Sequence, residues 1–228
     1  MDTKLILQYL TELKNNNSRE FYHAHKEEFK YANEEFKKLL KELILQIGRT
    51  DSSVLHNDPK DLTFKLMRDT RFSHDKSPYN PSFRAHIGPC GKLPIPAGYY
   101  IMLAPDGRSF LGGGLFADMF KDATAMVRSH IAANTGEWKR ILSDPQFQKY
   151  FTVRGTALKK VPEGFDPKSP QAEYLKYKSW YLEYPVSDQM VCDSGQFIKL
   201  AEAVFQAMQP FNAFINRALA GFVMPQRG

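Results

Sequence analysis

Residues 99 to 115 read Tyr99-Tyr-Ile-Met-Leu-Ala-Pro-Asp-Gly-Arg-Ser-Phe-Leu-Gly-Gly-Gly-Leu115, and this stretch predicts a β-hairpin. Tyr99 to Leu103 is an apolar run, Pro105-Asp106-Gly107 is typical of a tight turn, and Ser109 to Leu115 can return beside the first strand. Because the first strand is apolar at nearly every position, we expect the strand to be central in a sheet.

Three consecutive glycines, Gly112 to Gly114, stand in the second strand of the hairpin. A glycine run can let a phosphate approach the backbone, but this one lacks the Lys-Ser/Thr pair of a P-loop and matches no dinucleotide-binding fingerprint. Glycine inside a strand more often marks a bulge or the close approach of another backbone. We therefore expect close packing here and keep a phosphate cradle as the less favoured alternative.

Further strands are expected on either side of the hairpin. Phe83 to Ile87 alternates apolar and polar residues, Ser179 to Tyr184 favours a strand, and Leu62 to Leu66 is a third candidate. The spacing of apolar residues also predicts helices over Asp2–Leu13, Phe21–Ile47, Asp118–Ala133, Gly136–Leu142, Pro145–Phe151 and Ser194–Phe222. The expected architecture is α+β: a mainly antiparallel sheet packed against amphipathic N- and C-terminal helices, in a single domain over residues 1–228.

Several local features of these helices carry expectations of their own. Asn17 or Ser18 can cap the helix that ends near Gly48, and Asp118 can cap the helix that ends near Ala133. Arg128 is expected to face solvent, and Pro210 is expected to kink the last helix or divide it in two.

Composition describes a globular chain of 228 residues, of which 43% are hydrophobic. Lysine and arginine number 31 against 25 acidic residues, and the formal charge of +6 permits a nucleic acid or another anionic partner without requiring one. Cys90 and Cys192 form no CxxC pair, so we expect free thiols in a reducing cytoplasm. The sequence shows neither a signal-peptide core nor an apolar stretch long enough to span a bilayer.

The strongest concentration of charge is Arg68-Asp-Thr-Arg-Phe-Ser-His-Asp-Lys-Ser-Pro-Tyr79. Arginine offers a planar fork of donors that suits carboxylate or phosphate, so Arg68, Arg71 and Lys76 could hold an anion beside Tyr79. Asp75 could hold these cations in place, and Ser77-Pro78 places the segment on a loop. The alternative is an ion-pair cluster that only fastens the loop to the body.

A second group of polar residues lies near the start of the second helix. His25 stands on its apolar stripe, where a hydrogen-bonded core histidine is the favoured interpretation. The alternative is a pocket that His25 lines together with Asn16, Arg19 and Lys26. If the protein is an enzyme, the candidate general bases are Asp69, His25 and His74.

Motifs of other site classes are missing from the sequence. The six histidines do not fall at the spacing of a zinc protease, and no G-x-S-x-G elbow is present. The sequence therefore predicts no metal site and names no cofactor.

The order of these motifs resembles the DUF2461 family, an uncharacterised and mainly bacterial family of about this length. The matching segments are Asn16 to Phe21, His25-Lys26, Arg68-Asp69-Thr70-Arg71-Phe72, Asp75-Lys76, Tyr79, Gly98 to Tyr100, Phe110 to Gly114, Pro162 to Phe165 and Leu175 to Lys178. The chain departs from the family pattern at Lys65, where an arginine is usual, and at Lys168-Ser169-Pro170, where the family often has His-Pro. The resemblance strengthens the Arg68–Tyr79 segment as a site but implies no established activity.

Three functions remain open from the sequence. The preferred one is binding of an anionic ligand, bearing phosphate or carboxylate, which requires the Asn16–Lys26 and Arg68–Tyr79 segments to converge. The second is association with nucleic acid, supported by the basic balance and by Tyr99, Tyr100 and Trp180 if they are exposed. The third is a structural or interaction role in which the charged motif only fixes a loop. Neither the oligomeric state nor the physiological partner follows from the sequence.

Overall fold

The computed structural model describes residues 1–116 and 118–225, and it has an α+β fold. Its four strands form one antiparallel sheet in the order β1-β2-β3-β4. The strands are β1 (Phe83–Ile87), β2 (Gly98–Leu103), β3 (Ser109–Leu115) and β4 (Trp180–Val186).

The predicted hairpin is formed by β2 and β3, with Gly98 opposite Gly114 and Met102 opposite Phe110. Asp106 and Gly107 both have a φ of 66°, as expected for the turn that best matches the twist of paired strands. The strand β2 lies between β1 and β3, so its predicted central place is confirmed.

The N-terminal helices are α1 (Thr3–Asn15), α2 (Arg19–Ala24) and α3 (Lys26–Ile47). The prediction of one helix over Phe21–Ile47 was wrong, because the backbone leaves helical geometry at His25, whose φ and ψ are −107° and 33°, so α2 ends at Ala24 and α3 begins at Lys26. Ser18 is the N-cap of α2, where its hydroxyl accepts from the amide of Phe21. Leu39, Leu40 and Leu43 of α3 are fully buried in the core.

The segment before β1 contains the short helices η1 (Ser52–Val54) and α4 (Pro59–Leu62). The predicted strand over Leu62–Leu66 is absent from this part of the structure. One bridge joins Thr63 to Ala85, and one further bond runs from the amide of Phe64 to the carbonyl of Arg84. The bonding stops there because the chain turns away from the sheet edge into the Arg68–Tyr79 loop.

Helices α5 (Lys121–Ala133), α6 (Thr135–Ser143), α7 (Pro145–Tyr150) and α8 (Ala172–Leu175) follow β3. The prediction that Asp118 caps this helix was wrong, since α5 begins after Phe120 without a side-chain cap. The prediction of a solvated Arg128 was also wrong. This side chain is buried and donates to the carbonyls of Leu175 (2.7 Å) and Tyr177 (2.8 Å).

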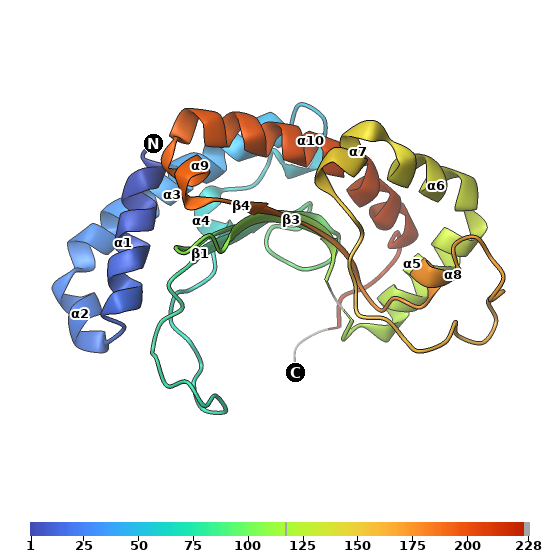
Figure 1. Ribbon diagram of the computed structural model, residues 1–228, viewed down its shortest axis with the longest axis horizontal. Coiled ribbons are helices and arrows are strands. Elements are labelled where there is room, and N and C mark those ends of the chain that lie inside the picture. Colours follow the sequence, from blue (N-terminus) through green and yellow to red (C-terminus); the bar gives the residue numbers. More distant parts are fainter. Residues whose placement is uncertain (117, 226–228) are drawn as a thin grey trace.

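The chain closes with α9 (Asp188–Cys192) and α10 (Ser194–Ala218). Pro210 lies inside α10, which remains one helix, although its ribbon changes direction part-way along in Figure 1. Figure 1 shows α10 across one face of the sheet, with α1–α3 at one end and α5–α8 at the other. Among the described residues, no helix crosses the opposite face, which we call the open face.

The glycine run explains how α10 packs so closely on β3. A Cβ at Gly113 would lie 2.2 Å from Sδ of Met208 on α10. Asn212 of the same helix donates to the carbonyl of Gly98 and accepts from the amide of Gly114. The expected close approach is therefore confirmed for these glycines.

Candidate functional site

The Arg68–Tyr79 segment is a loop that projects from the body of the protein (Figure 1). Two backbone hydrogen bonds close its base, from Arg68 to the carbonyl of Pro78 (2.9 Å) and from Asn80 to the carbonyl of Leu66 (2.8 Å). The loop therefore has a fixed base even though most of its side chains are exposed.

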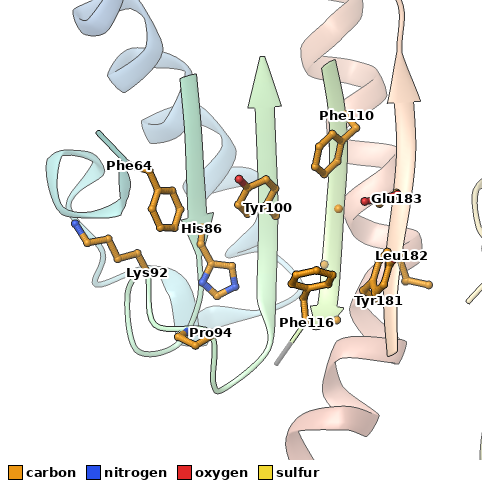
Figure 2. A pocket seen from close by; sticks show the side chains of 13 residues that line it. Phe64, His86, Lys92, Pro94, Tyr100, Phe110, Phe116, Tyr181, Leu182 and Glu183 are labelled. Carbon is orange, nitrogen blue, oxygen red and sulfur yellow. The ribbon is translucent and has the colours of Figure 1, made fainter. Parts of the chain in front are cut away.

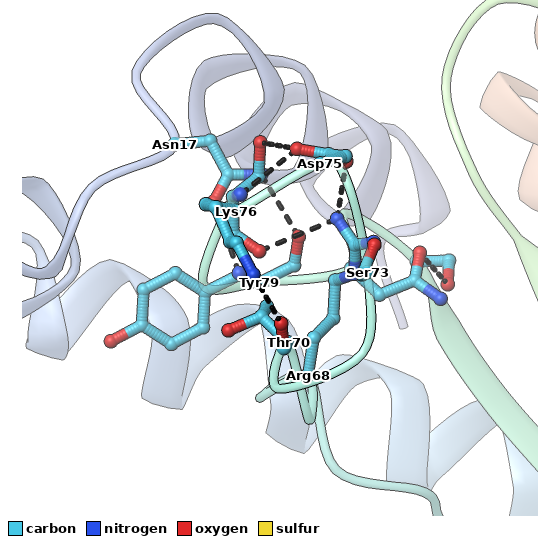
Figure 3. A network of polar contacts seen from close by, with 10 residues as sticks. Asn17, Arg68, Thr70, Ser73, Asp75, Lys76 and Tyr79 are labelled. Atoms are coloured by element: carbon cyan, nitrogen blue, oxygen red, sulfur yellow. Dashed lines mark hydrogen bonds and ion pairs between the residues drawn. The ribbon is translucent and has the colours of Figure 1, made fainter.

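A polar network organises the interior of this loop (Figure 3). The guanidinium of Arg68 pairs with Asp75 and donates to the carbonyl of Ser77 (3.3 Å) and the hydroxyl of Ser73 (3.3 Å). Asp75 also accepts from the amide (2.9 Å) and the hydroxyl (2.6 Å) of Ser77. These bonds from Ser77, with the smaller effect of Arg68, hold the pKa of the Asp75 carboxyl well below its ordinary value.

The other charged groups of the loop also bind within it. Arg71 forms a two-pronged pair with Asp69, with nitrogen–oxygen distances of 2.9 Å and 2.6 Å. The amine of Lys76 donates to the carbonyl of Thr70 at 3.0 Å (Figure 3). Phe72, at the loop tip, is 95% exposed.

The turn between α1 and α2 meets this loop through Asn17. The Asn17 amide donates to the carbonyl of Tyr79 (2.9 Å) and accepts from its backbone N–H (3.1 Å). The ring of Tyr79 is buried and stacks on Tyr22 of α2, with 4.6 Å between ring centroids. The two segments that the anion hypothesis required to converge do lie against each other.

A cavity of about 360 Å³ lies between the turn and the loop. Its lining includes three of the predicted cations, Arg19, Arg68 and Lys76, together with Tyr79. The remaining lining residues are Asn17, Ser18, Glu20, Met67, Thr70 and Pro78. We call this space the loop cavity.

The structure places the other predicted site residues outside the lining of the loop cavity. Asn16 is the C-cap of α1, where its side-chain amide donates to the carbonyl of Glu12, and Lys26 is exposed at the start of α3. Arg71 and Asp75 are engaged within the loop as described.

The three candidate general bases also lie outside that lining. His25 is half-buried, stacks on Phe21 at 3.9 Å, and places Nδ1 2.9 Å from the Phe21 carbonyl. His74 is exposed, and Asp69 is held by Arg71.

A second cavity, of about 350 Å³, lies on the open face of the sheet and was missed from the sequence (Figure 2). We call it the sheet cleft. Its lining residues are Phe64, His86, Lys92, Pro94, Tyr100, Phe110, Gly112, Gly113, Gly114, Phe116, Tyr181, Leu182 and Glu183. A signal was present, because Tyr100, Phe110 and Tyr181 each stand at a strand position whose neighbours are buried under the helices.

His86 is the most deeply buried polar side chain of the sheet cleft. It is only 8% exposed, and its Nδ1 has no hydrogen-bond partner among the described residues. Burial lowers the pKa of His86 to about 4, against smaller opposing effects of the Gly91 and Leu93 carbonyls. The imidazole is therefore neutral near pH 7 and keeps a lone pair that can accept a hydrogen bond.

The described residues contain no cluster of three or more histidine, cysteine, aspartate or glutamate side chains arranged to hold a metal ion. Within residues 1–116 and 118–225, no helix combines the length and apolar character that a membrane crossing requires. Cys90 and Cys192 are free and exposed.

Comparison with protein families gives a match to the family described as a conserved hypothetical protein (DUF2461), over residues 5–214. The chain belongs to the DUF2461 family. No curated protein and no solved structure matches the chain. The DUF2461 match spans every residue that lines the loop cavity or the sheet cleft, so both belong to the family region and neither is a terminal addition.

Proposed function

We propose that this DUF2461 protein binds a small anionic ligand, bearing phosphate or carboxylate, in the loop cavity. The observation that supports this proposal is the convergence of Arg19, Arg68 and Lys76 on one cavity whose lining includes a single carboxylate, Glu20. A local excess of positive charge in a concave site attracts anions and concentrates them.

The bonds that hold two of these cations favour binding. The guanidinium of Arg68 is fixed by Asp75, Ser73 and Ser77, and the amine of Lys76 is held at the carbonyl of Thr70. Donors already held in place lose little conformational entropy when a ligand arrives. Asp75 offsets part of the Arg68 charge, so Arg19 and Lys76 supply most of the free attraction for an anion.

The structural alternative depends on other bonds of the same loop. If the motif only fastens the loop, then the clamp from Asn17 to the backbone of Tyr79 is its main attachment to the body. The exposed pair of Arg71 and Asp69 adds little, since solvent and salt screen an ion pair at the surface. A ligand-binding measurement separates the two functions.

The proposed activity is binding, and we assign no reaction to the cavity. The candidate bases Asp69, His25 and His74 do not line it. We also propose a reducing, cytoplasmic setting, supported by the free and exposed thiols of Cys90 and Cys192.

Calorimetric titration of the full chain with inorganic phosphate, ribose 5-phosphate and citrate tests the proposal. We expect at least one of these anions to bind wild type. Arg19→Gln and Lys76→Gln should each weaken that binding about tenfold, which equals about 1.4 kcal/mol. The matched control is Arg71→Gln, which removes a cation of the same loop that lies outside the cavity, and it should bind as wild type does.

Two results would contradict the proposal. One is the absence of any heat of binding for all three anions. The other is a loss of affinity in Arg71→Gln equal to the losses in Arg19→Gln and Lys76→Gln, because the attraction would then come from net charge and not from the cavity. Binding should also weaken with added salt, as expected for exposed cations.

A further inference from the structure

The open face of the sheet carries aromatic rings where a sheet that faces water usually carries polar side chains. Tyr100 stacks beside Phe110 with 5.5 Å between ring centroids, and Phe64 lies 6.2 Å from Tyr100. At the other side of the sheet cleft, Phe116 meets Tyr181 edge to face at 5.1 Å. Figure 2 shows His86 between Phe64 of the first group and Phe116 of the second.

The shape of the sheet cleft suits a flat ligand. The backbone of Gly112 to Gly114 contributes to its lining without side chains, so a planar group can approach the strand closely. Phe116 is 68% exposed and Phe64 is 36% exposed, so both residues remain accessible to solvent. Large exposed aromatic side chains that surround a hollow are typical of a binding site and not of a finished core.

The sheet cleft also contains polar groups that could contact the edge of such a ring. His86 lines the sheet cleft and its imidazole is neutral, so one ring nitrogen is a donor and the other an acceptor. Burial raises the pKa of Tyr100, so its hydroxyl stays protonated and can donate. A ligand whose ring carries both donors and acceptors matches these groups better than a hydrocarbon does.

The charges at the rim of the sheet cleft are mainly positive. Lys92 lines it on the Phe64 side, and the guanidinium of Arg84 lies 5.8 Å from the centre of the Phe64 ring. Glu183, the only carboxylate in the lining, is paired with Arg154 at 3.0 Å. An anionic group attached to the ring would therefore be attracted toward Lys92.

We propose that the sheet cleft binds a nucleobase, with its sugar-phosphate directed toward Lys92. Stacking on aromatic side chains on an open antiparallel sheet is a general way in which proteins hold nucleobases. The same chemistry is offered by a free mononucleotide and by single-stranded RNA. This proposal is independent of the anion site, since the loop cavity and the sheet cleft share no lining residue.

The test follows the backbone amide signals of Gly112, Gly113 and Gly114 by NMR in the isotope-labelled full chain. Adenosine monophosphate, cytidine monophosphate and a five-nucleotide RNA are titrated, and ribose 5-phosphate serves as the ligand without a base. We expect a base-bearing ligand to shift these three signals, and we expect ribose 5-phosphate to leave them in place.

Matched variants locate the interaction. Phe116→Ala removes an exposed ring of the sheet cleft, does not disturb the core, and should weaken binding about tenfold. Phe72→Ala removes an exposed ring at the tip of the distant loop and should bind as wild type does. The glycine shifts should also be unchanged in Arg19→Gln. The test of the sheet cleft is then independent of whether the loop cavity binds an anion.

The relative affinities of the RNA and the mononucleotides distinguish the two sources of the nucleobase. Tighter binding of the RNA than of either mononucleotide assigns the site to single-stranded RNA, and equal or weaker binding assigns it to a free nucleotide. The proposal is overturned if no base-bearing ligand shifts the glycine signals at millimolar concentration. It is equally overturned if ribose 5-phosphate produces the same shifts, or if Phe116→Ala binds as wild type does.

Discussion

Arg128 is a buried cation that holds two parts of the chain together. Its side chain is on α5, and its guanidinium donates to the carbonyls of Leu175 and Tyr177, at the end of α8 and just beyond it. Its charge also lies 6.0 Å from the centre of the Phe165 ring. The side chain therefore fixes the long connection before β4 against α5, although no carboxylate neutralises it among the described ion pairs.

We predict that Arg128→Met lowers the free energy of unfolding by about 2 kcal/mol, because two buried carbonyls lose their donors. Methionine keeps most of the volume of the stem, so the loss reports the hydrogen bonds more than a cavity. Urea denaturation of wild type and variant measures the difference. Arg140→Met, at an exposed position of α6, is the control and should change the stability by less than about 0.5 kcal/mol. An equal loss in both variants would contradict the assigned role of Arg128.

The contact between β3 and α10 depends on the absence of side chains on the strand. A Cβ at Gly113 would lie 2.2 Å from Sδ of Met208 and 2.6 Å from the carbonyl oxygen of Gly98. The second of these atoms belongs to the neighbouring strand and cannot move without disturbing the β2–β3 pairing. Strand β3 therefore requires glycine at position 113 for packing against its neighbours and not for a turn.

We predict that Gly113→Ala destabilises the protein by about 1–3 kcal/mol, the usual cost of overpacking a closely packed core. Gly136→Ala is the matched control, because a Cβ there meets nothing within 4 Å and the position lies in α6. That change should stabilise by about 0.5–1 kcal/mol through helix propensity. Thermal unfolding of the two variants measures both effects, and a neutral Gly113→Ala would show that α10 can move away from the sheet at little cost.

Over the whole molecule, α10 connects the two ends of the fold. It packs against α3 and α9 at the N-terminal side, against α5 and α7 at the other, and against β3 between them. The buried side chains from all these elements form one continuous core cluster. We propose on this basis that residues 1–228 form a single domain.

A single domain of this kind should unfold in one cooperative step. Circular dichroism follows all the helices, whereas tryptophan fluorescence follows Trp138 and Trp180, which lie in α6 and β4. We predict coincident urea midpoints for the two signals. A helical signal that is lost before the fluorescence changes would contradict this, because it would mean that α1–α3 unfold as a separate unit.

The two segments that form the loop cavity could be located from the sequence, but the side chains that line the cavity could not. The anion-binding hypothesis required the Asn16–Lys26 and Arg68–Tyr79 segments to converge, and Asn17 does bind the backbone of Tyr79. Arg71 was expected beside Arg68, yet Asp69, two residues away, holds it at the loop tip. Of the three aromatics considered as exposed, Tyr99 and Trp180 are buried and Tyr100 is half-buried. The aromatic lining of the sheet cleft consists of Phe64, Tyr100, Phe110, Phe116 and Tyr181.

Local sequence determined the elements of this protein. Apolar periodicity, the caps at Ser18 and Asp144, and the turn at Asp106-Gly107 act over a few residues, so the pattern alone predicts α+β with a central hairpin. Tertiary structure decided which side chains meet. Whether Arg128 is solvated, and which face of the sheet α10 covers, depend on contacts between residues far apart in the chain. Burial and hydrogen-bond partners are properties of those contacts, and spacing along the chain does not encode them.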